Sequence, residues 1–218
     1  MKRDIPIAAG ILTASILGGM ALRMGDYGTV PWMVSRASGL VAFALLTGSM
    51  VLGLLISTKA GDGVLSRPFV FTIHQFISVI TLTFLGVHAG SLLFDGFLHF
   101  TVASLLVPAL SPYKPLWVGM GVVSAWVTAI VTASFWMRSR IGQKAWRKLH
   151  YASFVAYVGS LVHGAMSGTD TSNPVIAYGY VLSAALVAGL LAYRIAASSE
   201  KAAAPPPARR VPGTIDAR

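Results

Sequence analysis

Four histidines lie in two apolar stretches of the chain. Thirteen residues separate His74 from His88, and twelve separate His150 from His163. On α-helices, which rise about 1.5 Å per residue, the members of the two pairs would lie about 21 Å and about 19.5 Å apart. If two such helices lie side by side, each of them presents one histidine at each of two depths, and the depths match between the helices. The spacing therefore predicts two stacked metal centres, each bound by one histidine from each helix.

The ligand count favours haem iron over a bare metal ion. Neutral imidazole binds zinc, copper and iron alike, but a zinc or copper site would gather three or four ligands at one depth. These histidines come two and two, and no Asp or Glu lies inside a predicted span. Two axial imidazoles on a haem match this count. Because both axial positions are then filled, we predict electron-transfer centres.

Two other features bear on this interpretation. A single histidine inside a membrane is more often a hydrogen-bonding partner of a neighbouring helix, but two matched pairs are harder to assign to packing. The chain has no cysteine, which excludes disulfides, iron–sulfur clusters and covalent haem attachment through CxxCH.

The composition is that of an integral membrane protein. Of 218 residues, 55% are hydrophobic and only 11% are charged, and the mean hydropathy is +0.71. Soluble domains carry roughly 25% charged residues, so this chain has too few to cover a water-exposed surface. We attribute the net charge of +10 to cytoplasmic loops and anionic lipid headgroups rather than to nucleic acid.

The apolar stretches predict an all-α bundle of six membrane-spanning helices. The segment 95–115 is too short to cross a bilayer and contains prolines, so we expect an interfacial or re-entrant segment. The Pro- and Arg-rich tail, 198–218, is expected to be disordered, which leaves 1–197 as the transmembrane domain. The first apolar run also fits a secretory signal, but it lacks a convincing cleavage site. The predicted spans are 5–22, 32–58, 69–94, 116–137, 149–167 and 175–197.

The basic residues predict the orientation of the bundle. Six spans place both termini on one side, and fourteen of the seventeen Lys and Arg residues fall on that side. The positive-inside rule makes this side cytoplasmic. The third and fifth spans then both run outward, so His74 pairs with His150 near the cytoplasmic leaflet and His88 with His163 near the outer one. The three basic residues on the other side are Arg23, Arg36 and Lys114.

One part of this geometry requires a distorted helix. Fourteen steps of about 100° leave His74 and His88 roughly 40° apart, but thirteen steps leave His150 and His163 about 140° apart. The second pair therefore does not share a face on a straight helix. Gly159 and Gly164 could permit the distortion.

At these residues the chain resembles the ferric reductase-like transmembrane superfamily. That family includes the membrane domains of NADPH oxidases and eukaryotic ferric reductases, and the haem subunit of the bacterial methionine sulfoxide reductase system. The resemblance covers about 32–197 and implies six helices with two b haems. The short tail has no Gly-rich dinucleotide motif, so the chain looks like the stand-alone type of the bacterial cytoplasmic membrane, with a separate electron donor. The matching segments are the two histidine spacings, WMVSRASGL (32–40), WRKLHYASF (146–154) and HGAMSGTD (163–170).

Further polar residues have two interpretations each. Arg36 is either a snorkelling interfacial residue or a partner of an outer-haem propionate or of the acceptor, and the family has an arginine in a comparable place. Arg147 and Lys148, beside His150, either pair with inner-haem propionates or reflect topology alone. His99 is either a surface residue or a candidate near the acceptor. The three outer aspartates are expected to be solvated loop residues rather than general acids: Asp26, Asp95 and Asp170.

The sequence thus predicts the haem-binding membrane subunit of an oxidoreductase. Electrons would pass from a cytoplasmic donor, a flavin (FMN or FAD) or a quinol, to an acceptor or redox partner outside the membrane. One alternative is direct reduction of ferric iron or oxygen at the outer haem. A haem-free transporter is an alternative of a different class, which the lack of carboxylates inside the spans disfavours, and a purely structural bundle is the last.

Overall fold

The computed structural model describes residues 28–58 and 66–203, and every regular element in them is helical, as predicted. Four helices are long, three are short, and two single 3₁₀ turns lie between them. The helices are α2 (Val30–Thr58), α3 (Arg67–Ser91), α4 (Val102–Leu106), α5 (Pro115–Ile141), α6 (Gln143–His150), α7 (Ala152–Ser167) and α8 (Pro174–Ala203), with η2 (Leu92–Phe94) and η3 (Thr169–Ser172).

Four of these helices are long and apolar enough to cross a membrane. They are α2, α3 extended through η2, α5, and α8 from Pro174 to Ser199. The chain is therefore a multi-pass membrane protein in its architecture. The first predicted span, 5–22, lies outside the described residues. The fifth, 149–167, differs from the prediction because the chain forms two helices, α6 and α7, that meet at Tyr151.

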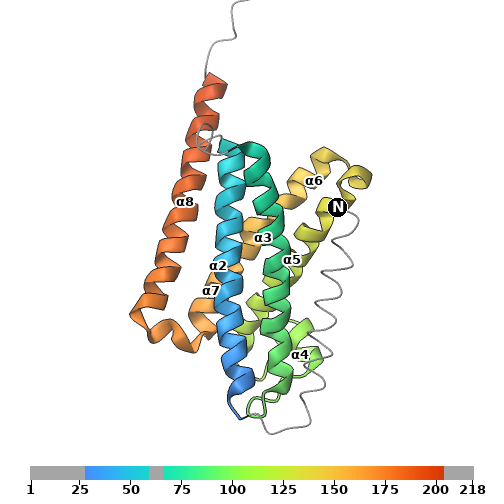
Figure 1. The fold of residues 1–218 in the computed structure, drawn as a ribbon, viewed down its shortest axis with the longest axis vertical. Helices are drawn as coiled ribbons and strands as arrows, with labels where there is room; N and C mark the ends of the chain where they lie inside the picture. Colours follow the sequence, from blue (N-terminus) through green and yellow to red (C-terminus); the bar gives the residue numbers. More distant parts are fainter. Residues whose placement is uncertain (1–27, 59–65, 204–218) are drawn as a thin grey trace, which may run out of the picture.

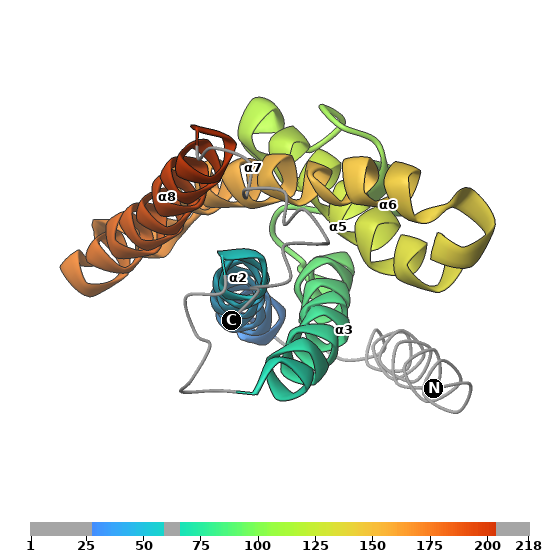
Figure 2. The same ribbon diagram turned by 90° about the horizontal axis from the view of Figure 1, so that it is seen from above.

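The helices form two layers. Figure 2 shows α2 and α3 together on one side, and α8, α7, α6 and α5 in a curved row on the other. Helices α2 and α3 pack along their length, α5 packs on α7, and α2 also contacts α7 and α8. Figure 1 shows α3 and α7 running in the same direction along the bundle, as the histidine pairing requires.

The polarity of the packing is that of a protein in lipid. Large apolar side chains lie on the outside, with Phe76 64% and Leu182 70% exposed, whereas small hydroxyl side chains such as Ser124 are buried. The buried hydroxyls bond to carbonyls of their own helices: Thr81 Oγ1 donates to Ile77 O at 2.8 Å and Thr128 Oγ1 to Ser124 O at 2.7 Å. Since lipid offers no hydrogen bonds, these internal partners satisfy the hydroxyls.

The segment 95–115 folds against one end of the bundle and does not cross it, in line with the prediction. Thr101 and Ser104 form a capping box at the start of the five-residue helix α4. Tyr113 Oη then donates to Ser167 O at 3.1 Å, and Lys114 Nζ donates to Met166 O at 2.8 Å. These two bonds tie the segment to the last turn of α7.

At the other boundary of the predicted domain, α8 continues to Ala203, six residues beyond the expected end at 197. The added segment, SSEKAA (198–203), contains good helix formers, and the first proline of the tail comes two residues after the helix ends. The rest of the tail, 204–218, lies outside the described residues.

Single-cysteine labelling tests the predicted orientation, because the natural chain has no cysteine. Lys144 in α6 and His99 between η2 and α4 are both exposed, and Figure 1 shows these two segments at opposite ends of the bundle. In intact spheroplasts, a membrane-impermeant maleimide should label His99→Cys directly and Lys144→Cys only after permeabilisation. The reverse pattern would overturn the orientation, and labelling of both from outside would overturn the transmembrane arrangement.

Candidate functional site

The structure brings the four histidines together in the two predicted combinations. His74 of α3 faces His150 of α6, and His88 of α3 faces His163 of α7. In both pairs the imidazole ring centres are 6.1 Å apart, and the ring planes are inclined at 74° and 75°. We call the first pair and its surroundings the inner site, and the second pair and its surroundings the outer site, after their predicted depths.

The junction at Tyr151 explains how His150 and His163 come to one side. Tyr151 N–H donates to Lys148 O at 3.2 Å, and Phe154 N–H donates to Tyr151 O at 3.1 Å, so both bonds span three residues instead of four. Such turns rotate by about 120° per residue rather than about 100°. This overwinding rotates His163 towards the face of His150, the direction that the thirteen-residue step requires. The distortion thus lies at Tyr151 rather than at Gly159 or Gly164.

Three of the four imidazoles are held by a backbone carbonyl of a facing helix. In each case the ring Nδ1–H donates, because a carbonyl oxygen only accepts, and in the neutral ring this bond leaves Nε2 with the lone pair that binds a metal. Serine hydroxyls add to two of these contacts, since Ser49 Oγ and Ser35 Oγ each lie 3.2 Å from the Nδ1 in question. The bonds are His74 to Ser49 O at 3.0 Å, His88 to Ser35 O at 2.9 Å, and His163 to Trp117 O at 2.9 Å.

Each of these carbonyls is followed, four residues later, by a glycine. A helical side chain covers the turn that precedes it, so a side chain at this position would lie over the carbonyl. A Cβ on Gly39 would be 2.7 Å from His88 Nδ1, one on Gly121 would be 2.6 Å from His163 Nδ1, and one on Gly53 would be 3.4 Å from His74 Cε1. We call a carbonyl with a glycine four residues later a glycine notch; it lets an imidazole reach the backbone.

The glycine notches leave a signal in the sequence that the prediction missed. On α2 the segments SRASG (35–39) and SMVLG (49–53) repeat after fourteen residues, the same step that separates His74 from His88. Because α2 and α3 pack along their length, two notches on one helix match two histidines on the other.

His150 has no such notch. Its Nδ1 is buried and has no hydrogen-bond partner among the described residues, and the same holds for Trp146 Nε1. Fourteen residues after Gly121, where a second notch on α5 would fall, the chain has Phe135. The rings of Phe135 and Trp146 have centres 6.3 Å apart, and those of Trp146 and His150 are 5.1 Å apart. Aromatic packing thus replaces the carbonyl at this histidine.

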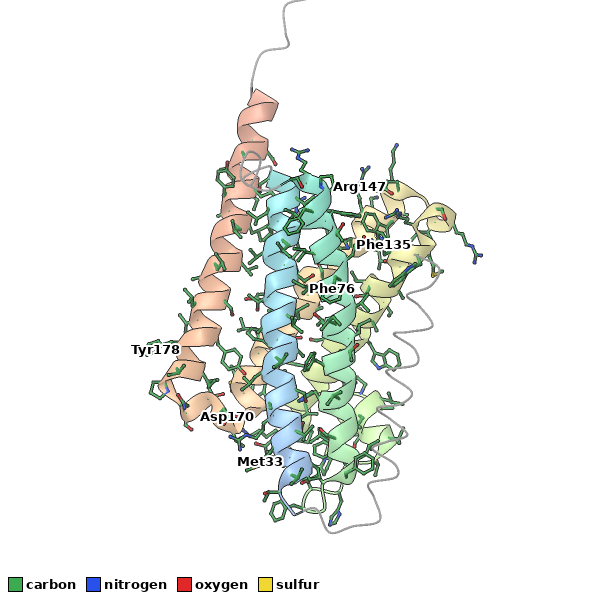
Figure 3. The ribbon with its side chains drawn as sticks, in the orientation of Figure 1. Met33, Phe76, Phe135, Arg147, Asp170 and Tyr178 are labelled. Carbon is green, nitrogen blue, oxygen red and sulfur yellow. The ribbon has the colours of Figure 1, made fainter. Side chains whose placement is uncertain are left out.

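Two cavities surround the histidine pairs. The inner cavity, of ≈ 350 Å³, contains His74 and His150, and the outer one, of ≈ 190 Å³, contains His88 and His163. Figure 3 shows Arg147, which lines the inner cavity, and Asp170, which lines the outer one, near opposite ends of the bundle. The wall between the cavities is shared, because Leu46, Thr81 and Thr128 line both.

The outer cavity contains an ion pair that the sequence did not reveal. Arg36 and Asp170 both line it, and the guanidinium contacts both carboxylate oxygens: Nε donates to Oδ2 at 2.8 Å, and Nη2 donates to Oδ1. The hydrogen bond from Arg36 lowers the pKa of Asp170 below its usual value. The prediction that Asp170 is a solvated loop residue is therefore wrong, because Arg36 holds it in the cavity wall.

The other predicted residues divide between the cavities and the surface. Asp95 is buried, 7% exposed, and accepts the Leu98 N–H at 2.7 Å, so its prediction as a solvated residue is also wrong. His99 is exposed and lines neither cavity, whereas Asp26 lies outside the described residues.

On the inner side, one of the two predicted basic residues reaches the cavity. Arg147 lines it, but Lys148 lines neither cavity, because adjacent residues on a helix point about 100° apart. Arg194 of α8, which the prediction missed, lines the inner cavity and donates to Tyr151 Oη at 3.0 Å. The positive-inside rule already accounts for a basic residue near the end of a span. No local sequence pattern therefore marks Arg194 as a residue of the cavity.

Comparison with known proteins finds no matching family model, curated protein or solved structure. Within residues 28–58 and 66–203, no three His, Cys, Asp or Glu side chains gather into a group that could hold a metal ion by themselves. The site is therefore defined by its own geometry, two pairs of imidazoles in two cavities, and the family resemblance stays a prediction.

Replacing a notch glycine tests whether the close approach matters. Gly39→Ala or Gly121→Ala should destabilise the fold by about 1–3 kcal/mol, since the new Cβ overlaps the histidine ring. Gly48→Ala is the matched control on α2, because nothing lies within 4 Å of its Cβ position, and helix propensity should make it neutral or stabilising by up to about 1 kcal/mol. Thermal unfolding in detergent measures the difference; equal effects at Gly39 and Gly48 would refute the notch.

The Arg36–Asp170 pair predicts a pH dependence. Because the pKa of Asp170 is lowered, the pair stabilises the fold above the ordinary Asp pKa of about 3.9 and loses this effect as the pH falls through the lowered value. Asp170→Asn should therefore lower the unfolding temperature at pH 7 but not at strongly acidic pH. Arg36→Gln should do the same, and the double variant should add nothing further. Parallel pH profiles for the wild type and both single variants would show that the pair is not formed.

Proposed function

We propose that the chain binds two b haems, one between His74 and His150 and one between His88 and His163, and conducts electrons across the membrane. The observation that carries this proposal is the spacing of the rings. A metal–imidazole bond is about 2.0 Å and the nitrogen lies about 1.1 Å from the ring centre, so two imidazoles on opposite sides of one metal ion have centres about 6.2 Å apart. Both pairs have 6.1 Å.

The residues present fit haem in three further respects. The notches leave Nε2 as the free nitrogen of three imidazoles. Most of the surface of both cavities is apolar, which suits a porphyrin face. Guanidinium groups line each cavity: Arg147 and Arg194 in the inner one could pair with propionate carboxylates, whereas Arg36 in the outer one is already paired with Asp170.

Bound haem would supply one-electron chemistry at each of two depths. The chain itself holds the imidazoles in the neutral form and excludes water with its apolar packing. Between the sites, His74 and His88 are about 21 Å apart along α3, and Leu46, Thr81 and Thr128 form the packed wall. These residues keep the two centres separate yet adjacent, as stepwise transfer needs.

The rest of the proposal follows the resemblance and the charge distribution. The chain is a six-span bundle similar to the ferric reductase-like superfamily, in a bacterial cytoplasmic membrane. A flavin or quinol donates electrons at the inner site, and an acceptor outside the membrane receives them at the outer site. Reconstituted vesicles that reduce a soluble ferric chelate without a partner protein would favour direct reduction instead.

Haem stoichiometry tests the proposal. The purified wild type should show b-type Soret and α bands and bind two haems per chain, measured as the pyridine haemochrome. His88→Ala and His163→Ala should each reduce this ratio to one, because each removes a ligand of the outer site. His99→Ala is the control and should retain two, since His99 lies outside both cavities. Absent b-type bands, or an unchanged ratio in His88→Ala, would refute the proposal.

A further inference from the structure

We propose that His150 is an exchangeable ligand, so that the inner haem can take a small diatomic molecule in its place while the outer haem cannot. This inference rests on the proposed function, because it needs haem at both sites. It adds a binding position for a class of ligand, diatomic π-acceptors, of which carbon monoxide is the probe. His150 differs from the other three histidines in three respects.

The first difference is the hydrogen bond at Nδ1. A bond from the remote ring nitrogen fixes the orientation and the tautomer of a metal-bound imidazole. His74, His88 and His163 each have this bond to a backbone carbonyl, which cannot move without its helix. The buried Nδ1 of His150 has no partner among the described residues. Since a buried donor without an acceptor is unfavourable, movement of this ring towards any acceptor lowers the free energy.

The second difference is the backbone. His88 lies within α3 and His163 within α7, whereas His150 is the last residue of α6, next to the overwound junction at Tyr151. The turn at this junction is held by bonds spanning three residues, which have poorer geometry than those of an α-helix. The backbone at His150 is therefore the easiest to deform among the three positions.

The third difference is space. Phe135 stands fourteen residues after the notch glycine Gly121, and its ring contacts Trp146, which in turn contacts His150. The inner cavity, ≈ 350 Å³, is larger than the outer one, ≈ 190 Å³. The inner site is thus the more spacious of the two for a ring that leaves the metal.

The exchange itself transfers no electrons. The iron–Nε2 bond to His150 breaks, the imidazole keeps its lone pair, and the incoming molecule donates its own pair to the vacated position. Ferrous iron binds carbon monoxide, so the test uses protein reduced with dithionite.

The experiment counts carbon monoxide bound per chain from the absorption difference spectrum. Wild-type protein should bind one molecule per two haems. His88→Ala, which keeps only the inner haem, should bind one molecule at that haem. No binding, or binding to both haems of the wild type, would overturn the inference, as would a His88→Ala haem that does not react.

The notch glycines provide a gain-of-binding test. Gly121→Ala forces His163 off the Trp117 carbonyl and should raise the stoichiometry from one to two; Gly39→Ala acts in the same way on His88. Gly48→Ala is the matched control and should stay at one. If neither notch variant gains a second molecule while retaining two haems, restraint by the notch is not what protects the outer site. A preparation without b-type bands would instead refute the proposed function, so the two failures are distinguishable.

Discussion

The hydrogen bond from an imidazole to a backbone carbonyl of a facing helix is the interaction on which the site depends. A helical carbonyl is normally covered by the side chain four residues later, and a glycine at that position leaves it open. With Gly39, Gly53 and Gly121 in place, three histidines reach Ser35, Ser49 and Trp117 and are fixed in one orientation. The close packing of α2 on α3 and of α5 on α7 follows from the same glycines, since a Cβ at either Gly39 or Gly121 would push the histidine-bearing helix away.

The membrane environment makes these contacts strong determinants of the structure. Apolar side chains gain nothing by leaving lipid for the interior, so the helices associate through small residues, hydroxyls and hydrogen bonds. The buried positions accordingly hold serines and threonines, whereas many large apolar side chains face outward. In such an interior a neutral imidazole with one satisfied nitrogen is far better tolerated than a charged or unpaired one. This makes the exception, His150, the most informative residue of the site.

Much of the fold could be predicted from hydrophobic length and histidine spacing. The four long helices lie where the apolar stretches place them, and a fourteen-residue step on one helix was enough to predict two depths. The break at Tyr151 could not be located, because no proline or glycine marks it. The only indication was that thirteen residues of a straight helix leave His150 and His163 on different faces, so that some distortion was needed.

The polar contacts of the site were the hardest part to predict. Arg36 and Asp170 are 134 residues apart in sequence, and the residues around each of them do not predict the contact. Charge alone suggested that both were interfacial or solvated. The glycine notches, in contrast, leave a pattern in the sequence. The SxxxG spacing occurs twice in α2, and it becomes informative once a glycine is known to expose the carbonyl four residues before it.

Electron paramagnetic resonance of the oxidised protein tests the central claim most directly. Two imidazoles on opposite sides of one ferric haem give a low-spin signal, and ring planes inclined at 74° and 75° should make it highly anisotropic with a large maximum g value. We expect two such signals in the wild type, one of which disappears in His88→Ala. A spectrum with only high-spin ferric haem, or with no haem signal, would contradict the claim that the histidine pairs share iron.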